Sequence, residues 1–121
     1  MRILSITAQK PHSTGSGVYL TETVCGFKEL GHTQAVIAGV TREDSVKLPE
    51  GVGFYPVYYN SPELPFPVCG MSDEMPYEST RYRYMKPDMV DKFEAAFGST
   101  VLRAVKEFRP DVVICHHLYL L

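Results

Sequence analysis

Two short segments of the chain carry residues that could bind a ligand or move a proton. Gly15, Ser16 and Gly17 follow the first apolar run, and backbone N–H groups in a glycine-containing loop can receive a phosphate. His116 and His117 follow the last apolar run, and a histidine can donate a hydrogen bond or transfer a proton near neutral pH. These residue types predict an anion-binding or proton-transfer site if the fold brings the two segments together.

Each segment also has a plainer interpretation. Gly15 and Gly17 equally fit a tight turn that needs positive φ angles. His116 or His117, taken alone, fits a hydrogen-bonded histidine packed under a covering helix. His12 lies in the first loop and is expected to reach the same edge of the fold as the other candidates.

The motifs of common cofactor and metal sites are absent. A dinucleotide site needs GxGxxG, whereas Gly17 is followed by Val18, Tyr19 and Leu20. It also needs an acid at the tip of the second strand, and the residues there are Gly39, Val40 and Thr41. The P-loop pattern GxxxxGK[ST] does not occur either. Neighbouring strand residues point to opposite faces, so the histidine pair does not suit one metal ion. We therefore expect neither a metal nor a resident cofactor.

Apolar periodicity predicts the elements that position the first segment. Leu20, Val24, Phe27 and Leu30 share one helical face, and Gly31 is a suitable helix stop. The predicted elements are a strand over Met1–Ala8, a helix over Gly17–Leu30, a buried strand over Ala35–Val40 and a weaker strand over Gly53–Tyr59. Strand, helix and strand form a βαβ unit, which places the first loop at the carboxyl edge of a parallel sheet, where ligands tend to bind.

The second half of the chain completes the same pattern. Asp88 is the expected N-cap of a helix that Pro110 ends, and Val112–Cys115 is the expected fully buried strand that carries the histidine pair. The apolar stripe of this helix comprises Val90, Phe93, Phe97, Val101, Leu102, Val105 and Phe108. The whole chain, residues 1–121, is thus predicted to be one α/β domain with a Rossmann-like, doubly wound parallel sheet.

A long segment over residues 60–87 interrupts this pattern. It is rich in proline and tyrosine, and such a loop in a compact domain is usually functional or mobile. Its Tyr77, Tyr82 and Tyr84, with Arg81 and Arg83, resemble a sugar-binding or partner-binding surface. A solvated loop explains the same residues nearly as well.

Composition excludes several classes of protein. Of 121 residues, 45% are hydrophobic and 21% charged, so a folded core is expected. The net charge of −2 lacks the basic excess of nucleic-acid-binding proteins, although peripheral membrane contact stays open. Three cysteines without a CxxC pair suit a reducing cytoplasm. The apolar ending, residues 118–121, lacks a covering helix, which suggests an N-terminal piece of a longer chain.

Several segments in order resemble one enzyme family. They are Met1 to Ile6, Gly15 to Tyr19 at the helix entry, Glu29-Leu30-Gly31-His32, and Arg109 to Val113 leading into His116-His117. This arrangement resembles the N-terminal domain of GT-B fold glycosyltransferases, specifically glycosyltransferase family 4.

The resemblance implies a function and roles for the candidates. The chain would be the acceptor-side domain of a retaining enzyme that transfers sugar from a nucleotide-diphosphate sugar to a glycan, lipid or small-molecule acceptor, with no obligatory metal. Gly15, Ser16 and Gly17 would contact the donor diphosphate or the sugar. His116 matches the second histidine of the family's His-x-His pattern, which lies near the transferred sugar. His117 matches the polar position next to that histidine. A C-terminal, donor-binding domain would be missing, so this fragment alone would be inactive.

Two alternatives come from other classes. A free-standing α/β module could use the same glycine segment to hold a phosphate or nucleotide without catalysis. A small flavodoxin-like regulatory domain is disfavoured, because the first strand is not followed by the acidic pair of phosphorylation receivers.

Overall fold

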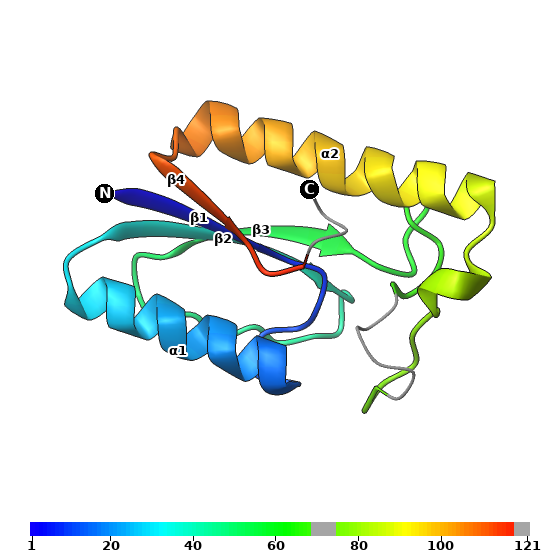
Figure 1. Ribbon diagram of the computed structural model, residues 1–121, viewed down its shortest axis with the longest axis horizontal. Coiled ribbons are helices and arrows are strands. Elements are labelled where there is room, and N and C mark those ends of the chain that lie inside the picture. The colour runs from blue at the N-terminus through cyan, green and yellow to red at the C-terminus, as the bar shows by residue number, and fades with distance from the viewer. Residues whose placement is uncertain (69–74, 118–121) are drawn as a thin grey trace.

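The computed structural model describes residues 1–68 and 75–117 and has an α/β fold with a four-stranded, all-parallel sheet (Figure 1). The strands are β1 (Arg2–Thr7), β2 (Thr33–Val40), β3 (Gly53–Tyr58) and β4 (Val112–Cys115), in the spatial order β3-β2-β1-β4. Helix α1 (Gly15–Glu29) covers one face of the sheet and α2 (Pro87–Phe108) the other. The predicted Rossmann-like, doubly wound fold is confirmed.

The strand register brings the carboxyl ends of the strands to one edge. Ile6 of β1 pairs with Ile37 of β2 on one side and with Cys115 of β4 on the other. The segments that follow β1 and β4 therefore leave the sheet next to each other, as the parallel arrangement requires. This register positions the candidate residues.

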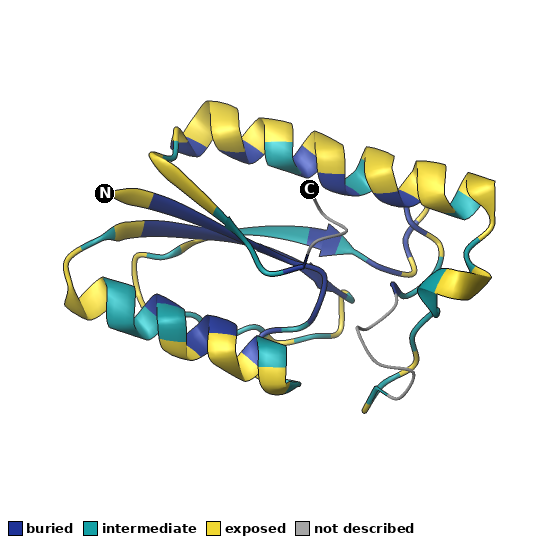
Figure 2. Cartoon of the chain, viewed as in Figure 1, coloured by how far each residue is buried: buried dark blue, intermediate teal, exposed yellow. Residues whose placement is uncertain are grey.

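Each face of the sheet has its own apolar core (Figure 2). Toward α1, buried Leu20 and Val24 pack against Val36, Ala38 and Val40 of β2. Toward α2, the larger core includes side chains of β1, β2, β3 and α2, among them Leu4, Ile6, Ile37, Val57, Phe93, Phe97 and Phe108. The period-2 alternation of β1 and β2 divides their side chains between these two cores.

Helix α1 ends where the sequence predicts, at a glycine. Gly31 has φ +81°, a left-handed conformation that glycine adopts at little cost. The Gly31 N–H donates to the Lys28 carbonyl, and the His32 N–H donates to the Phe27 carbonyl. These two bonds form the Schellman motif. Leu30 is 73% exposed and does not share the buried face predicted for it.

Both helices begin at positions other than those predicted. Helix α1 starts at Gly15 rather than Gly17, because Thr14 caps it and accepts a hydrogen bond from the Gly17 N–H. Helix α2 starts at Pro87, so Asp88 lies in its first turn and Lys86 holds the N-cap position. Proline suits a first helical position, since its missing N–H would have no helical partner there.

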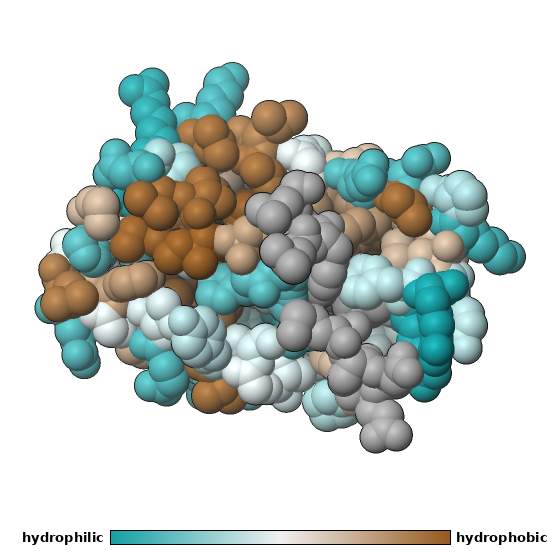
Figure 3. Space-filling model, viewed as in Figure 1, coloured by the Kyte–Doolittle hydropathy of each residue, from teal (hydrophilic) through white to brown (hydrophobic). Residues whose placement is uncertain are grey.

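Strand β4 is an edge strand, and the prediction that it is fully buried was wrong. Val112 and Val113 are 39% and 48% exposed, since no further strand or helix covers them among the described residues. Val90, Leu102 and Val105 of α2 are exposed as well, whereas the predicted apolar stripe included all three. We call Leu102, Val105, Val112 and Val113 the apolar band; Figure 3 shows hydrophobic side chains gathered over this end of α2 and β4.

The described part of the proline- and tyrosine-rich segment holds one 3₁₀ turn, η1 (Tyr82–Tyr84), as its regular structure. Tyr82, Met85 and Phe66 are partly buried and pack against the larger core. Residues 69–74 of this segment lie outside the described residues. Neither described helix has the combination of length and apolar character that crossing a membrane requires.

Candidate functional site

The helix N-terminus after β1 lies at the carboxyl edge of the sheet. Gly15, Ser16 and Gly17 form the first turn of α1 rather than a loop before it. The Gly17 N–H is satisfied by Thr14 Oγ1 at 3.1 Å, whereas the first-turn amides of Gly15 and Ser16 have no acceptor within the helix. No acidic residue stands in this turn to offset its partial positive charge. The turn therefore retains the electrostatic character of an anion site.

The two glycines of this turn serve different purposes. A Cβ on Gly17 would lie 2.2 Å from the carbonyl oxygen of Lys10, so glycine is required there for α1 to approach the loop after β1. A Cβ on Gly15 would meet nothing within 4 Å. Neither residue has the positive φ angle that the plainer turn interpretation required. Close packing explains Gly17, and it leaves Gly15 without a structural requirement.

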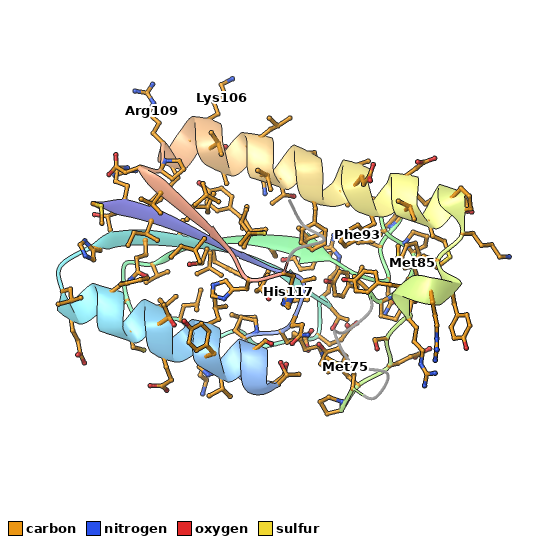
Figure 4. All side chains as sticks on the ribbon, viewed as in Figure 1. Met75, Met85, Phe93, Lys106, Arg109 and His117 are labelled. Atoms are coloured by element: carbon orange, nitrogen blue, oxygen red, sulfur yellow. The ribbon has the colours of Figure 1, made fainter. Side chains whose placement is uncertain are left out.

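His117 is buried beside the end of β1. Its side chain is 2% exposed, and its Nε2 lies 3.3 Å from Oγ1 of Thr7 (Figure 4). Burial, with a smaller contribution from the charge of His116, lowers the pKa of His117 from 6.5 to about 4. The imidazole is therefore neutral at physiological pH and offers one donor and one acceptor nitrogen.

His116 points toward α1. Its backbone N–H donates to the Ile6 carbonyl at 2.9 Å, and its ring contacts Tyr19 edge-on with a centroid distance of 6.0 Å. Burial lowers the pKa of His116 as well. Its Nε2 is buried and has no hydrogen-bond partner among the described residues. An unsatisfied buried polar atom is costly, so this nitrogen is a candidate for contact with a ligand.

A chain of hydrogen bonds joins the histidine pair to the helix N-terminus. Thr7 Oγ1 accepts a bond from the Gln9 N–H at 3.1 Å while it contacts His117. The Oε1 atom of Gln9 in turn accepts a bond from Thr14 Oγ1 at 2.5 Å, and Thr14 caps α1. We call Thr7, Gln9 and Thr14 the polar relay. The two candidate segments are thus brought together, as the parallel topology predicts.

The polar relay was missed by the sequence analysis. A sequence signal for it exists, because the polar residues Thr7 and Gln9 stand at and just after the end of a largely apolar strand. In the structure each of them is 3% exposed or less. Thr14 is a residue type that favours the N-cap position. These observations would have predicted both the earlier helix start and a hydrogen-bonded strand end.

His12 takes no part in this relay. Its φ of 66° lies in the left-handed region, and its exposed ring nitrogen Nε2 is 2.6 Å from the carbonyl oxygen of Lys47. The ring therefore contacts the segment between β2 and β3. The structure does not bring His12 into contact with the histidine pair.

A second polar cluster lies further along the same edge. Lys10 Nζ forms an ion pair with Asp44 Oδ1 at 2.8 Å and lies 4.8 Å from the ring centroid of Tyr77. Although burial acts to raise it, hydrogen bonds from Lys10 and Thr41 hold the pKa of Asp44 below its usual value. Lys10, Thr41 and Tyr77, together with Asn60, line a cavity of about 190 Å³. Sequence analysis singled out Tyr77 but not Lys10 or Asp44.

Potential metal ligands do not gather at this edge. Within residues 1–68 and 75–117, no three His, Cys, Asp or Glu side chains are arranged to hold a metal ion. The arrangement instead combines helix N–H groups, neutral imidazoles and hydroxyls. Such groups can bind an anion and hydrogen-bond the hydroxyls of a ligand.

The fold and this site define an α/β domain of Rossmann-like type with a cluster of polar groups at the carboxyl ends of its strands. A scan against models of protein families finds no match for the chain, and a search of curated proteins finds no relative. The geometry of the site is accordingly the basis for a functional proposal.

Proposed function

We propose that this chain is the N-terminal, acceptor-side domain of a retaining glycosyltransferase with a GT-B fold, of the kind grouped in glycosyltransferase family 4. The observation that carries the proposal is the polar relay, which joins the start of α1 to the histidine pair after β4. A sugar nucleotide has a charged diphosphate next to a hydroxylated sugar. Adjacent anion-binding and hydroxyl-binding groups suit that combination.

In this proposal, the first turn of α1 receives negative charge of the donor. The amides of Gly15 and Ser16 and the partial positive charge of the helix N-terminus favour a phosphate oxygen. Such preformed dipoles stabilise charge that develops as the sugar leaves the diphosphate, and they need no metal. The cap by Thr14 holds this turn in position.

His116 contacts the transferred sugar. Its neutral imidazole, with an unpartnered Nε2, provides a hydrogen-bonding group for a sugar hydroxyl. His117 acts through its bond to Thr7 and is a positioning residue for the strand end. The Lys10–Asp44 cluster, with Tyr77, borders the region where an acceptor glycan, lipid or small molecule would lie.

The remainder of the catalytic machinery belongs to a C-terminal domain in the same polypeptide. The apolar band along β4 and α2 supports this part of the proposal, since exposed apolar surface of this kind is usually covered by protein. The 121-residue chain presents one side of a cleft and would therefore bind a nucleotide sugar weakly.

The test uses the full polypeptide encoded by the gene, incubated with nucleotide-diphosphate sugars and analysed for released nucleotide and for the anomeric configuration of the product. His116→Ala should lower turnover about 100-fold, the usual range for loss of one group that acts in a transition state, with little change in unfolding midpoint. Wild-type turnover in this variant would remove His116 from the site, and an inverted product would exclude the retaining mechanism.

The competing candidate is a free-standing phosphate- or nucleotide-binding module, which the same helix N-terminus favours. Calorimetry on the 121-residue chain distinguishes the two. A micromolar dissociation constant, worth about 8 kcal/mol, would favour the binding module. Binding weaker than about 1 mM is expected of half a cleft.

A further inference from the structure

The cavity beside Lys10 lies where three parallel strands end. Lys10 stands in the loop after β1, Thr41 comes directly after β2, and Asn60 follows the end of β3. Ligands of open α/β sheets tend to bind outside the carboxyl ends of the strands. The volume of about 190 Å³ is smaller than the roughly 300–1,000 Å³ of sites for drug-sized ligands, so the cavity has room for one ring-sized group.

The charged groups that line or contact this cavity leave one negative charge unmatched. The ammonium of Lys10 is already paired, since Oδ1 of Asp44 lies 2.8 Å from it. Glu78 also lines the cavity, and within residues 1–68 and 75–117 its carboxylate has no ion-pair partner. A phosphate or carboxylate ligand would therefore meet a like charge and a cation that is already paired. The cavity disfavours an anionic ligand.

The same walls offer both hydrogen-bond donors and acceptors. The hydroxyl of Thr41 donates to Oδ2 of Asp44 at 3.0 Å, so its lone pairs remain as acceptors. The side-chain amide of Asn60 can donate twice and accept, and it has no hydrogen-bond partner in the part of the chain that the structure describes. Lys10 keeps two ammonium hydrogens beyond the one directed at Asp44. Because a hydroxyl group both donates and accepts, this mixture suits a polyol.

Tyr77 and Pro67 add apolar surface to the cavity. The centroid of the Tyr77 ring lies 4.8 Å from Nζ of Lys10. Burial raises the pKa of Tyr77, whereas hydrogen bonds with the Lys10 backbone and the Ser13 side chain act in the opposite direction. These contacts hold the ring against the loop after β1. An aromatic ring beside polar groups suits a sugar, which has C–H groups on its faces and hydroxyls around its rim.

We propose that this cavity binds a single neutral sugar ring, with its hydroxyls at Thr41, Asn60 and Glu78 and its C–H groups against Tyr77 and Pro67. The inference rests on the proposed function in one respect, since that function makes the ring part of the acceptor. It selects a carbohydrate acceptor rather than a lipid chain or a phosphorylated sugar. The groups that bind it are separate from the α1 N-terminus and the histidine pair.

The test titrates the methyl glycosides of glucose, galactose and mannose into the 121-residue chain and follows its amide NMR spectrum. At least one glycoside should saturate the chain with a dissociation constant of about 20 mM or less. The largest amide shifts should fall at Lys10, Thr41 and Asn60. The 6-phosphate of the same sugar should bind at least about fivefold more weakly, because its charge is repelled by Glu78.

Two substitutions test the assigned groups. Asn60→Gly removes the amide and tolerates the left-handed φ of 53°, so affinity for the glycoside should fall about three- to tenfold. Glu78→Gln keeps the shape and removes the charge, so the preference for the neutral ring over its 6-phosphate should shrink at least about threefold. Glu29→Gln is the matched control, because Glu29 is exposed at the last position of α1, at the opposite edge of the sheet (Figure 1). It should change neither affinity by more than about twofold.

Three results would overturn the proposal: no saturation by any of the three glycosides up to about 20 mM, a 6-phosphate that binds as tightly as its neutral glycoside, or the same behaviour in Glu78→Gln and Glu29→Gln. Amide shifts confined to residues outside the cavity would overturn it even if Asn60→Gly failed to fold.

Hydrolysis of nucleotide sugars by the full polypeptide tests the proposed function separately, because water then takes the place of the acceptor. Hydrolysis that depends on His116, without binding of any glycoside, would overturn the sugar site and leave the proposed function standing. Glycoside binding with the expected preferences, without hydrolysis, would support the sugar site and count against the proposed function.

Discussion

The imidazole Nε2 of His117 lies 3.3 Å from the hydroxyl of Thr7, which joins the end of β4 to the end of the central strand β1. Both side chains are buried, and the same hydroxyl accepts a bond from the Gln9 amide. One hydroxyl therefore supports the strand end and the first residues of the loop. Its removal tests how much of the site depends on it.

Thr7→Val keeps the shape of the side chain and removes the hydroxyl. The buried Gln9 N–H loses its acceptor, so the free energy of unfolding should fall by about 1–3 kcal/mol. Thr7→Ser retains the hydroxyl and is the matched control, with a smaller loss from the missing methyl group. Urea denaturation measures both. If Thr7→Val lowered the free energy of unfolding no more than Thr7→Ser does, the hydroxyl of Thr7 would contribute nothing to stability.

Stability should depend on pH through His117. Its pKa is about 4 in the folded protein against 6.5 for an ordinary histidine, so between these values the unfolded chain binds more protons. Stability is therefore present above pH 6.5 and is lost as the pH falls toward 4, by up to roughly 3 kcal/mol. His116 shifts in the same direction and adds to this loss.

Unfolding free energies measured from pH 7.5 to 4.5 test this dependence. His117→Gln removes the titrating group and keeps an amide that can hydrogen-bond, so its pH profile should be flatter than that of the wild type. A profile of unchanged slope would mean that His117 is already protonated, or freely solvated, in the folded protein.

The two glycines at the start of α1 provide a matched pair. Gly17→Ala places a methyl group against the Lys10 carbonyl and should cost about 1–3 kcal/mol, because backbone must move to make room. The added methyl group of Gly15→Ala would have no atom within 4 Å. This substitution should be neutral or should stabilise the protein by about 0.4–1 kcal/mol, since alanine restricts the unfolded chain. Thermal unfolding midpoints compare the two variants. Equal effects would contradict the close approach of α1 to the loop at Gly17.

Most of the fold was predictable from local patterns. Apolar runs and helical spacing identified all four strands and both long helices, because each strand is short and apolar and each helix has a periodic face. The helix starts were less predictable from single residues. The sequence analysis placed the start of α1 at Gly17 and the N-cap of α2 at Asp88, whereas Thr14 caps α1 and Pro87 begins α2. Capping depends on local geometry that several neighbouring residues can satisfy.

The site was predictable in location more than in composition. Parallel topology places the end of β4 beside the loop after β1, so the proximity of His116, His117 and the glycine turn follows from the element order. The Lys10–Asp44 ion pair joins residues 34 positions apart, and no local pattern indicates it. Contacts between loops depend on how each loop closes, which periodicity does not encode.

The apolar band should make the 121-residue chain self-associate. Val113 lies on β4, whose outer edge is unpaired among residues 1–68 and 75–117, and such an edge with exposed apolar side chains tends to pair with another chain. Val113→Lys should shift the chain toward monomer, since a lysine on an edge strand opposes pairing. Val18→Lys is the matched control: Val18 is equally exposed, at 48%, but lies on α1 away from the band. Sedimentation velocity over a range of concentrations compares the variants. If Val18→Lys converts oligomers to monomers and Val113→Lys does not, the association surface lies on α1, and the apolar band does not mediate self-association in solution.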